Sequence, residues 1–256
     1  MENKKIIVAN LKMDMDAAEV SEYLKSIVGK VNGSNIIICP SSIYIPYFLK
    51  HRFSIGMQNI CEENKGNYTG EISARQASSL GIKYSLVGHS ERRINYGEDN
   101  SSISKKINSL FENNMIPILC VGETNEEKNL LKTNKVLKSE LVTCLSEVNK
   151  ENISKIIISY EPIWAVGSKR IPTMAEIKNT VKYIKELIKK IYNVDIKVIY
   201  GGSINSNNIE KIKKIECLDG IMIGTSSIVV SEFMKIIEVV DSEWLLFIFF
   251  DKIRQN

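Results

Sequence analysis

The sequence predicts an α/β protein with a single domain, a closed barrel of eight parallel strands with helices on its outside. Short runs rich in β-branched residues alternate with longer stretches of helical periodicity, which is typical of repeated βα units. Eight such units in 256 residues fit a (β/α)8 barrel. An open doubly wound sheet is the alternative, but no Gly-x-Gly-x-x-Gly motif follows the first strand.

The expected strands share a mostly apolar character without strict alternation, as strands covered on both faces should. They are Ile6–Asn10, Asn35–Cys39, Phe53–Asn59, Tyr84–Val87, Ile116–Val121, Lys155–Tyr160, Ile196–Tyr200 and Gly220–Ile223. Such runs alternating with helices favour a parallel sheet, in which every strand needs a crossover connection.

The expected helices carry apolar residues at a spacing of three or four. In Asp16–Val31 these residues are Val20, Leu24 and Ile27, which would share one face. Similar stretches are Ser102–Asn113, Thr173–Tyr192, Ser206–Lys213 and Val230–Val239. No linker or shift of composition divides the chain, so we expect one domain over residues 1–240, followed by an atypical apolar tail, 241–256.

The composition limits the function classes. A net charge of +4, with lysines scattered along helical faces, does not indicate a nucleic-acid-binding protein. The five cysteines form no CxxC pair and no Cys/His metal spacing, so we expect no metal site and a reducing, cytoplasmic compartment. A strand begins within five residues of Met1, and we expect no signal peptide.

A glutamate stands at the carboxyl end of the sixth expected strand. Glu161 is followed at once by Pro162 and then by an aromatic and apolar stretch that closes on Gly167. A carboxylate in this position, with Pro and Gly bracketing the next segment, indicates a catalytic base under a hinged loop. The alternative is a strand end with a chance glutamate.

Other chemistry-bearing residues fall at the same end of the predicted barrel. Asn10 ends the first strand, Lys12 follows it, and His89 follows the fourth. The loops after strands seven and eight contain glycines, which let backbone N–H groups approach a phosphate closely. Each residue has a plainer interpretation, such as a solvated lysine, a structural histidine or an ordinary turn. Their coincidence at one barrel end favours a site for a small phosphorylated substrate.

Several segments, in this order, resemble the triosephosphate isomerase family from about Lys4 to Val240. They are Ala9–Met13, Gly66–Ser73, Val87–Arg93, Cys120–Thr124, Tyr160–Gly167 and Tyr200–Asn205. The resemblance implies a TIM barrel, a glycolytic and gluconeogenic isomerase that interconverts dihydroxyacetone phosphate and D-glyceraldehyde 3-phosphate, and no cofactor. It also implies a cytoplasmic homodimer that interlocks through the loop around Thr69.

The resemblance assigns roles residue by residue. Glu161 would move a proton between two substrate carbons, neutral His89 would donate to the substrate oxygens, and Lys12 and Asn10 would stabilise negative charge. The residues that would face the phosphate are Gly167, Ser203, Gly224 and Thr225. The loop after Glu161 would close over the site as a lid. Glu123 would be the partner of the tryptophan of this lid, Trp164, when the lid is open.

The end of the lid departs from the family pattern Gly-Thr-Gly-Lys-Thr-Ala. Lys169 replaces a glycine, and Pro172 replaces a residue whose backbone N–H would bond Tyr200 when the lid closes. Because proline has no N–H, we predict that Tyr200 lacks this bond. Thr225 replaces a glycine and would crowd the phosphate. These departures leave two alternatives: an isomerase of a four-carbon ketose phosphate, or a weakly catalytic barrel that binds phosphorylated metabolites.

The tail contains seven consecutive apolar residues, Trp244–Phe250. This run is too short to span a bilayer. The tail would either contact a membrane surface or add a protein interface, or it would be a covered segment or a non-native terminal sequence. We favour the last two interpretations and expect no membrane association.

Overall fold

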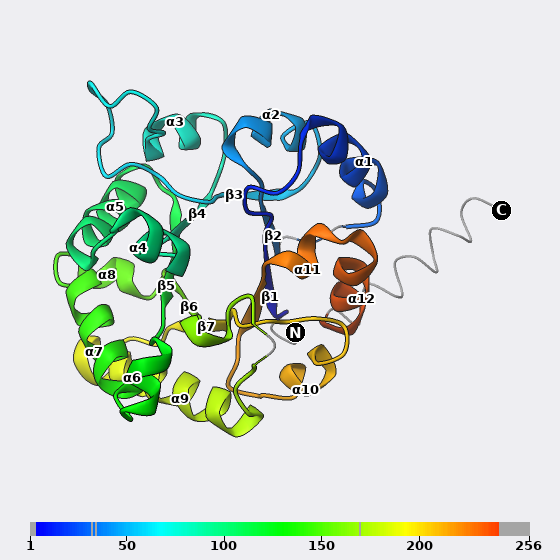
Figure 1. Cartoon of the computed structure of the whole chain (residues 1–256). Helices are drawn as coiled ribbons and strands as arrows, with labels where there is room; N and C mark the ends of the chain where they lie inside the picture. The colour runs from blue at the N-terminus through cyan, green and yellow to red at the C-terminus, as the bar shows by residue number, and fades with distance from the viewer. Residues whose placement is uncertain (1–3, 32, 34, 169, 241–256) are drawn as a thin grey trace.

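The strands form one closed barrel. The computed structural model describes residues 4–31, 33, 35–168 and 170–240, and within them β1 to β8 pair in chain order, with β8 returning to β1 (Figure 1). Every pairing is parallel. The predicted TIM-barrel fold is therefore confirmed. The predicted tail, 241–256, and Lys169 lie outside the described residues.

The strand bounds agree closely with the prediction. The strands are β1 (Ile6–Asn10), β2 (Ile36–Cys39), β3 (Ser54–Met57), β4 (Tyr84–Val87), β5 (Ile116–Val121), β6 (Ile157–Tyr160), β7 (Lys197–Tyr200) and β8 (Gly220–Ile223). Half of them have the predicted bounds, and the others are shorter by one to three residues. The predicted strand 53–59 loses most, because its last residues already belong to the loop above the barrel.

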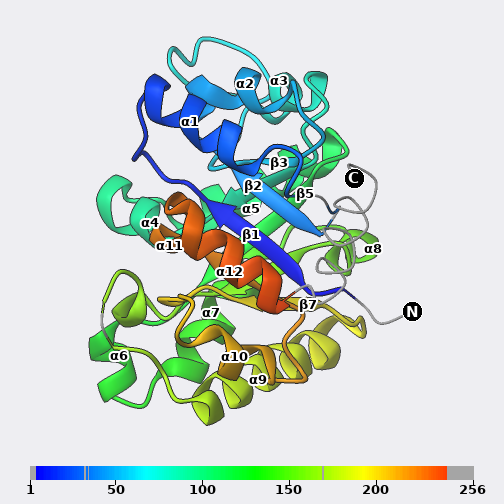
Figure 2. The ribbon, with the colours of Figure 1, turned by 90° about the vertical axis from the view of Figure 1, so that its right-hand side faces the viewer.

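Helices surround the barrel and cover its outer face (Figures 1 and 2). They are α1 (Ala17–Ile27), α2 (Ile45–Phe48), α3 (Ala74–Ser79), α4 (Ser90–Tyr96), α5 (Asn100–Glu112), α6 (Asn125–Asn129), α7 (Thr133–Cys144), α8 (Lys150–Ile153), α9 (Met174–Tyr192), α10 (Ile209–Lys213), α11 (Thr225–Ile228) and α12 (Val230–Val240), with single turns η1 (Ser42–Tyr44) and η2 (Ile163–Ala165). Capping boxes fix the starts of α1, α3, α6 and α9.

The sequence did not predict α7. Its buried residues are only Leu137, Leu141 and Cys144, and most of its other residues are polar, so the apolar stripe is narrow. The helix is nevertheless important for the site, because it places Glu140 beneath the ends of β4 and β5.

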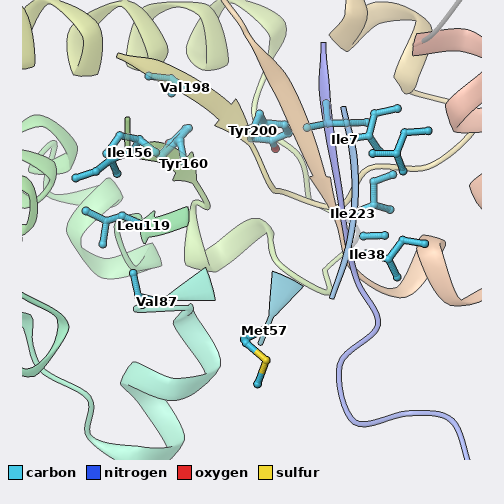
Figure 3. Packing of buried hydrophobic residues seen from close by; sticks show 14 of the residues in the cluster. Ile7, Ile38, Met57, Val87, Leu119, Ile156, Tyr160, Val198, Tyr200 and Ile223 are labelled. Carbon is cyan, nitrogen blue, oxygen red and sulfur yellow. The ribbon is translucent and has the colours of Figure 1, made fainter. Parts of the chain in front are cut away.

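The core has two layers, separated by the barrel wall. Val8, Ile37 and Met222 belong to the cluster inside the barrel. The larger cluster lies between the strands and the helices, and it includes Ile7 and Tyr200 (Figure 3). Residues of one strand alternate between the two layers, as the period of a β-strand requires. The uniformly apolar strands are thereby explained, since both of their faces are buried.

All five cysteines are free, and Cys39 and Cys120 are in the core. Among the described residues, no group of His, Cys, Asp and Glu side chains could hold a metal ion. The described helices include none with the length and apolar character needed to cross a bilayer.

Candidate active site

A cavity of about 290 Å³ opens where β1, β4, β7 and β8 end. Seven of the eight predicted site residues line it: Asn10, Lys12, His89, Gly167, Ser203, Gly224 and Thr225. The eighth, Glu161, borders a narrower neighbouring pocket and reaches the cavity through its contact with His89. The fold thus brings all the predicted residues to one end of the barrel.

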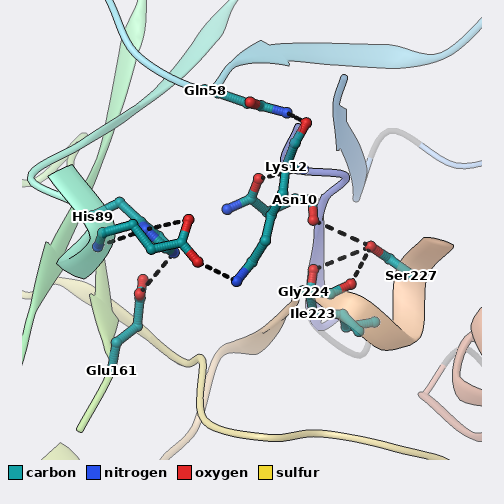
Figure 4. A network of polar contacts seen from close by, with 9 residues as sticks. Asn10, Lys12, Gln58, His89, Glu161, Ile223, Gly224 and Ser227 are labelled. Atoms are coloured by element: carbon teal, nitrogen blue, oxygen red, sulfur yellow. Dashed lines mark hydrogen bonds and ion pairs between the residues drawn. The ribbon is translucent and has the colours of Figure 1, made fainter. Parts of the chain in front are cut away.

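The chain reverses sharply after β1 and points Lys12 across the cavity. Asn10 is buried, with 4% of its surface exposed, and its Oδ1 accepts a hydrogen bond from the Lys12 backbone N–H at 3.1 Å. Lys12 has a left-handed backbone, with φ of 53°. Its carbonyl accepts hydrogen bonds from Ser41 Oγ at 2.7 Å and from Gln58 Nε2 at 2.8 Å (Figure 4). These bonds hold the unusual backbone in place.

The Lys12 ammonium group pairs with the Glu91 carboxylate. The stem of Lys12 passes over Gly224, where a Cβ would lie 3.2 Å from the lysine Cε. A glycine at this position therefore leaves room for the lysine. Glu91 had no predicted role. Its position two residues after His89, at the start of α4, is the signal that could have placed it in the site.

The hydrogen bonding of His89 fixes which ring nitrogen carries the proton. His89 is the N-cap of α4, and its Nδ1 accepts a hydrogen bond from the Glu91 backbone N–H at 3.3 Å. A nitrogen that accepts such a bond keeps its lone pair, so the ring hydrogen of the neutral imidazole is on Nε2. Nε2 lies 3.3 Å from Glu161 Oε2 (Figure 4).

Glu161 is almost completely buried, with 1% of its surface exposed. Neither carboxylate oxygen has an aligned hydrogen-bond donor among the described residues, and the His89 contact has hydrogen-bond distance without hydrogen-bond alignment. The Cys120 thiol lies nearby; burial, and then the Glu161 charge, raise its pKa well above the ordinary value. The thiol therefore stays neutral.

Comparison with known proteins agrees with this arrangement. The family model for triosephosphate isomerase matches residues 5–240. The chain belongs to the triosephosphate isomerase family. Proteins named triosephosphate isomerase from Clostridium botulinum strain Loch Maree and from Francisella philomiragia are 34% and 33% identical to it. The alignments cover 91% of this chain in both cases, and 98% and 96% of the respective relatives. The chain is accordingly an isomerase of this family, as predicted.

The first half of the lid, residues 162–166, is hydrogen-bonded to the barrel through Trp164. Trp164 Nε1 donates to Glu123 Oε1 at 2.9 Å, which confirms the predicted pairing of these two residues. The Tyr160 hydroxyl also lies within 3.3 Å of both oxygens of the fully buried Glu123. Lys128 Nζ is 4.2 Å from the centre of the indole ring, at cation–π distance.

Ser203 connects the loop after β7 to the lid. Its hydroxyl contacts the carbonyl oxygens of Ala165 and Ser168, the latter at 2.9 Å. A serine hydroxyl has one hydrogen, so this side chain is committed to the lid. Any hydrogen bond from Ser203 to a ligand in the cavity would therefore come from its backbone N–H.

The predicted loss of the Tyr200 bond to the second half of the lid, residues 167–172, concerns the closed lid and stays a prediction. The Tyr200 hydroxyl is buried and has no hydrogen-bond partner among the described residues. Pro172 is buried and cannot donate. Thr225, the first residue of α11, is exposed and lines the cavity, so its side chain faces space that a ligand would share.

Proposed function

We propose that this isomerase interconverts dihydroxyacetone phosphate and D-glyceraldehyde 3-phosphate through an enediolate, as a step of glycolysis and gluconeogenesis. The observation that carries the proposal is the 3.3 Å approach of the buried Glu161 carboxylate to His89 Nε2, beside a cavity that a lysine also enters. Proton transfer next to a carbonyl needs a base, a neutral hydrogen-bond donor and a cation around the substrate, and these three groups meet here.

Glu161 is the proposed base. It takes a proton from one carbon of the substrate and returns it to the neighbouring carbon, so that the carbonyl moves along the chain. Its burial supports this role, because water is kept away from the enediolate. Its lone pairs also have no aligned donor that the substrate would first have to displace.

His89 is the proposed electrophile and acts as a neutral imidazole. Protonation of Nδ1 would set its hydrogen against the Glu91 N–H at the start of α4, which opposes the imidazolium form. Nε2 then carries the ring hydrogen, 3.3 Å from Glu161 Oε2 and at the edge of the cavity that His89 lines. It can donate to a substrate oxygen as negative charge develops there.

Lys12 and Asn10 are proposed to stabilise negative charge on the phosphate and the enediolate. An ammonium group has three hydrogens, and the pairing with Glu91 occupies one direction. Backbone N–H groups of Gly167, Ser203, Gly224 and Thr225 are the proposed phosphate donors, since all four residues line the cavity that Lys12 also lines. No cofactor enters the proposed mechanism.

The decisive experiment is the initial rate of glyceraldehyde 3-phosphate isomerisation by the purified full-length chain and by Glu161→Asp. Shortening the side chain withdraws the carboxylate from the carbon, and we expect kcat to fall on the order of 100-fold or more. Glu126→Asp, an exposed glutamate on α6, is the matched control and should leave kcat unchanged. Equal rates for Glu161→Asp and the parent would overturn the proposed role.

The same assay separates the alternative functions. A parent enzyme that turns over a four-carbon ketose phosphate faster than the triose phosphates would reassign the substrate. Binding of phosphorylated metabolites without turnover would instead favour a binding protein.

We also propose that the chain is a homodimer that interlocks through the loop around Thr69. In support, a second cavity beside the site is lined by Met13, Gly70, Ile72 and Tyr96, and Met13 and Tyr96 are 92% and 71% exposed. Large exposed apolar side chains that gather at one place are typical of an interface. Sedimentation at micromolar concentration should give twice the chain mass; a monomer with full activity would contradict the proposal. The free cysteines support the cytoplasm as its compartment.

A further inference from the structure

A buried ion pair lies beside the site but outside its cavity. Glu140 projects from α7 and Arg93 from α4, and their side chains are 12% and 14% exposed. Glu140 Oε1 is 3.7 Å from Arg93 Nη1, and Oε2 accepts a hydrogen bond from the Gly122 backbone N–H at 3.0 Å. Neither side chain lines the cavity, and Arg93 borders the narrow pocket that Glu161 also borders. The contacts of the pair with the backbone of the site are its most direct link to the two catalytic residues.

Arg93 holds the turn that presents His89. Its Nε donates to the Gly88 carbonyl at 2.8 Å, and its Nη2 donates to the Cys120 carbonyl at 3.3 Å. Gly88, the residue before His89, has a φ of 69°, and a Cβ there would lie 3.0 Å from Arg93 Nη2. The guanidinium group thus joins the end of β4 to the end of β5.

Glu140 holds the backbone against which Glu161 rests. A Cβ on Gly122 would lie 1.9 Å from the carbonyl oxygen of Glu161, so the two backbones are in direct contact. The Glu161 N–H also donates to the Val121 carbonyl at 2.8 Å. A shift of Gly122 would therefore move Glu161.

We infer that Glu140 and Arg93 form a positioning pair for the isomerase reaction, which holds Glu161 and His89 at their working separation by fixing Gly122 and Gly88. The inference rests on the function proposed above for the two catalytic residues. The pair acts on their geometry and touches no substrate. Misplacement of reacting groups by about 1 Å is enough to lower a rate substantially.

The ionisation of Glu140 makes the pair dependent on pH. Burial raises the pKa of its carboxyl to about 7, while Arg93 and the backbone N–H oppose this rise and the charges of Glu127 and Glu123 add to it. Burial also raises the pKa of the neighbouring Cys144 thiol to about 12, so that group stays neutral. Only the ionised carboxylate attracts Arg93 as a full charge. The pair therefore forms as the pH rises through the neutral range.

The variant Glu140→Gln tests the inference, because an amide keeps an acceptor for Gly122 but has no charge for Arg93. At pH 8 we expect kcat to fall roughly tenfold while KM stays within about twofold. At pH 6 the kcat values of variant and parent should converge, because the parent carboxyl is then protonated. Glu147→Gln, an exposed carboxylate beyond the end of α7, is the charge-matched control and should match the parent at both values.

Thermal unfolding supplies a reading that does not depend on activity. Folding raises the pKa of the Glu140 carboxyl from the ordinary value of 4.5 to about 7. The ionisation of this group therefore lowers the free energy of unfolding of the parent as the pH rises from about 4.5 to about 7. The midpoint of Glu140→Gln minus that of the parent should therefore increase from pH 5 to pH 7.5. A constant difference would overturn the assigned ionisation.

The outcomes distinguish this inference from the proposed function. An unchanged kcat in Glu140→Gln at pH 8, or an equal loss at pH 6 and pH 8, would overturn the positioning role while leaving the isomerase assignment intact. A parent enzyme without triose phosphate turnover would instead refute the proposed function, whatever the unfolding midpoints show.

Discussion

The two halves of the lid differ in how they are attached to the barrel. In the first half, the Trp164 indole N–H is bonded to Glu123, which lies under the lid and also contacts the Tyr160 hydroxyl. In the second half, Pro172 has no N–H, and the Tyr200 hydroxyl is buried without a partner among the described residues. The side-chain hydrogen bonds described above therefore attach the lid to the barrel through Trp164 and Ser203.

The packing of Tyr200 does not depend on a hydrogen bond from its hydroxyl. Tyr200 remains packed in the core, with its ring centre 6.1 Å from that of Tyr160. The ring therefore contributes apolar burial, while its hydroxyl contributes no hydrogen bond. A buried hydroxyl without a partner costs about 1–3 kcal/mol.

The larger effect should come from the first half. In Trp164→Phe the ring is kept but the bond to the Glu123 carboxylate is lost, and we expect kcat to fall about tenfold, equivalent to about 1.4 kcal/mol. Release of inorganic phosphate from the intermediate should rise, because the lid protects the enediolate less well. Steady-state rates and a phosphate assay measure both effects. Unchanged kcat and phosphate release would show that the Glu123 bond does not control the lid.

The smaller effect should come from the second half, and a double-mutant cycle measures it. In the parent, Tyr200→Phe should change kcat by less than about twofold and raise the unfolding midpoint by a few degrees, because an unbonded buried hydroxyl is removed. Pro172→Ala supplies an N–H and should raise turnover or lower phosphate elimination.

The coupling energy between Pro172→Ala and Tyr200→Phe tests whether the Tyr200 hydroxyl can support the second half of the lid. In the Pro172→Ala background, Tyr200→Phe should lower kcat severalfold, with a coupling energy of about 0.5–1.5 kcal/mol. A large loss from Tyr200→Phe alone would mean that the hydroxyl already supports the lid. Pro172→Ala with neither kcat nor phosphate elimination altered would mean that the hinge does not depend on this bond.

Local sequence patterns predicted the barrel because both faces of each strand are buried and the helices carry apolar stripes. The eight predicted site residues follow strand ends, and the parallel topology alone brings them together. The patterns did not predict Glu91 as the partner of Lys12, because the two are 79 residues apart. They also missed Glu140, whose significance depends on burial beside Gly122 and not on any motif.

The left-handed backbone of Lys12 sets fold stability against activity at a single position. A residue other than glycine or asparagine pays about 1 kcal/mol or more to adopt such a conformation, because its Cβ crowds the backbone. A population of variants selected only for resistance to heat should therefore drift toward glycine here. Such drift would remove the only cation that lines the main cavity among the described residues. Stability alone would therefore favour glycine at this position, whereas the role proposed for Lys12 in catalysis requires the lysine side chain.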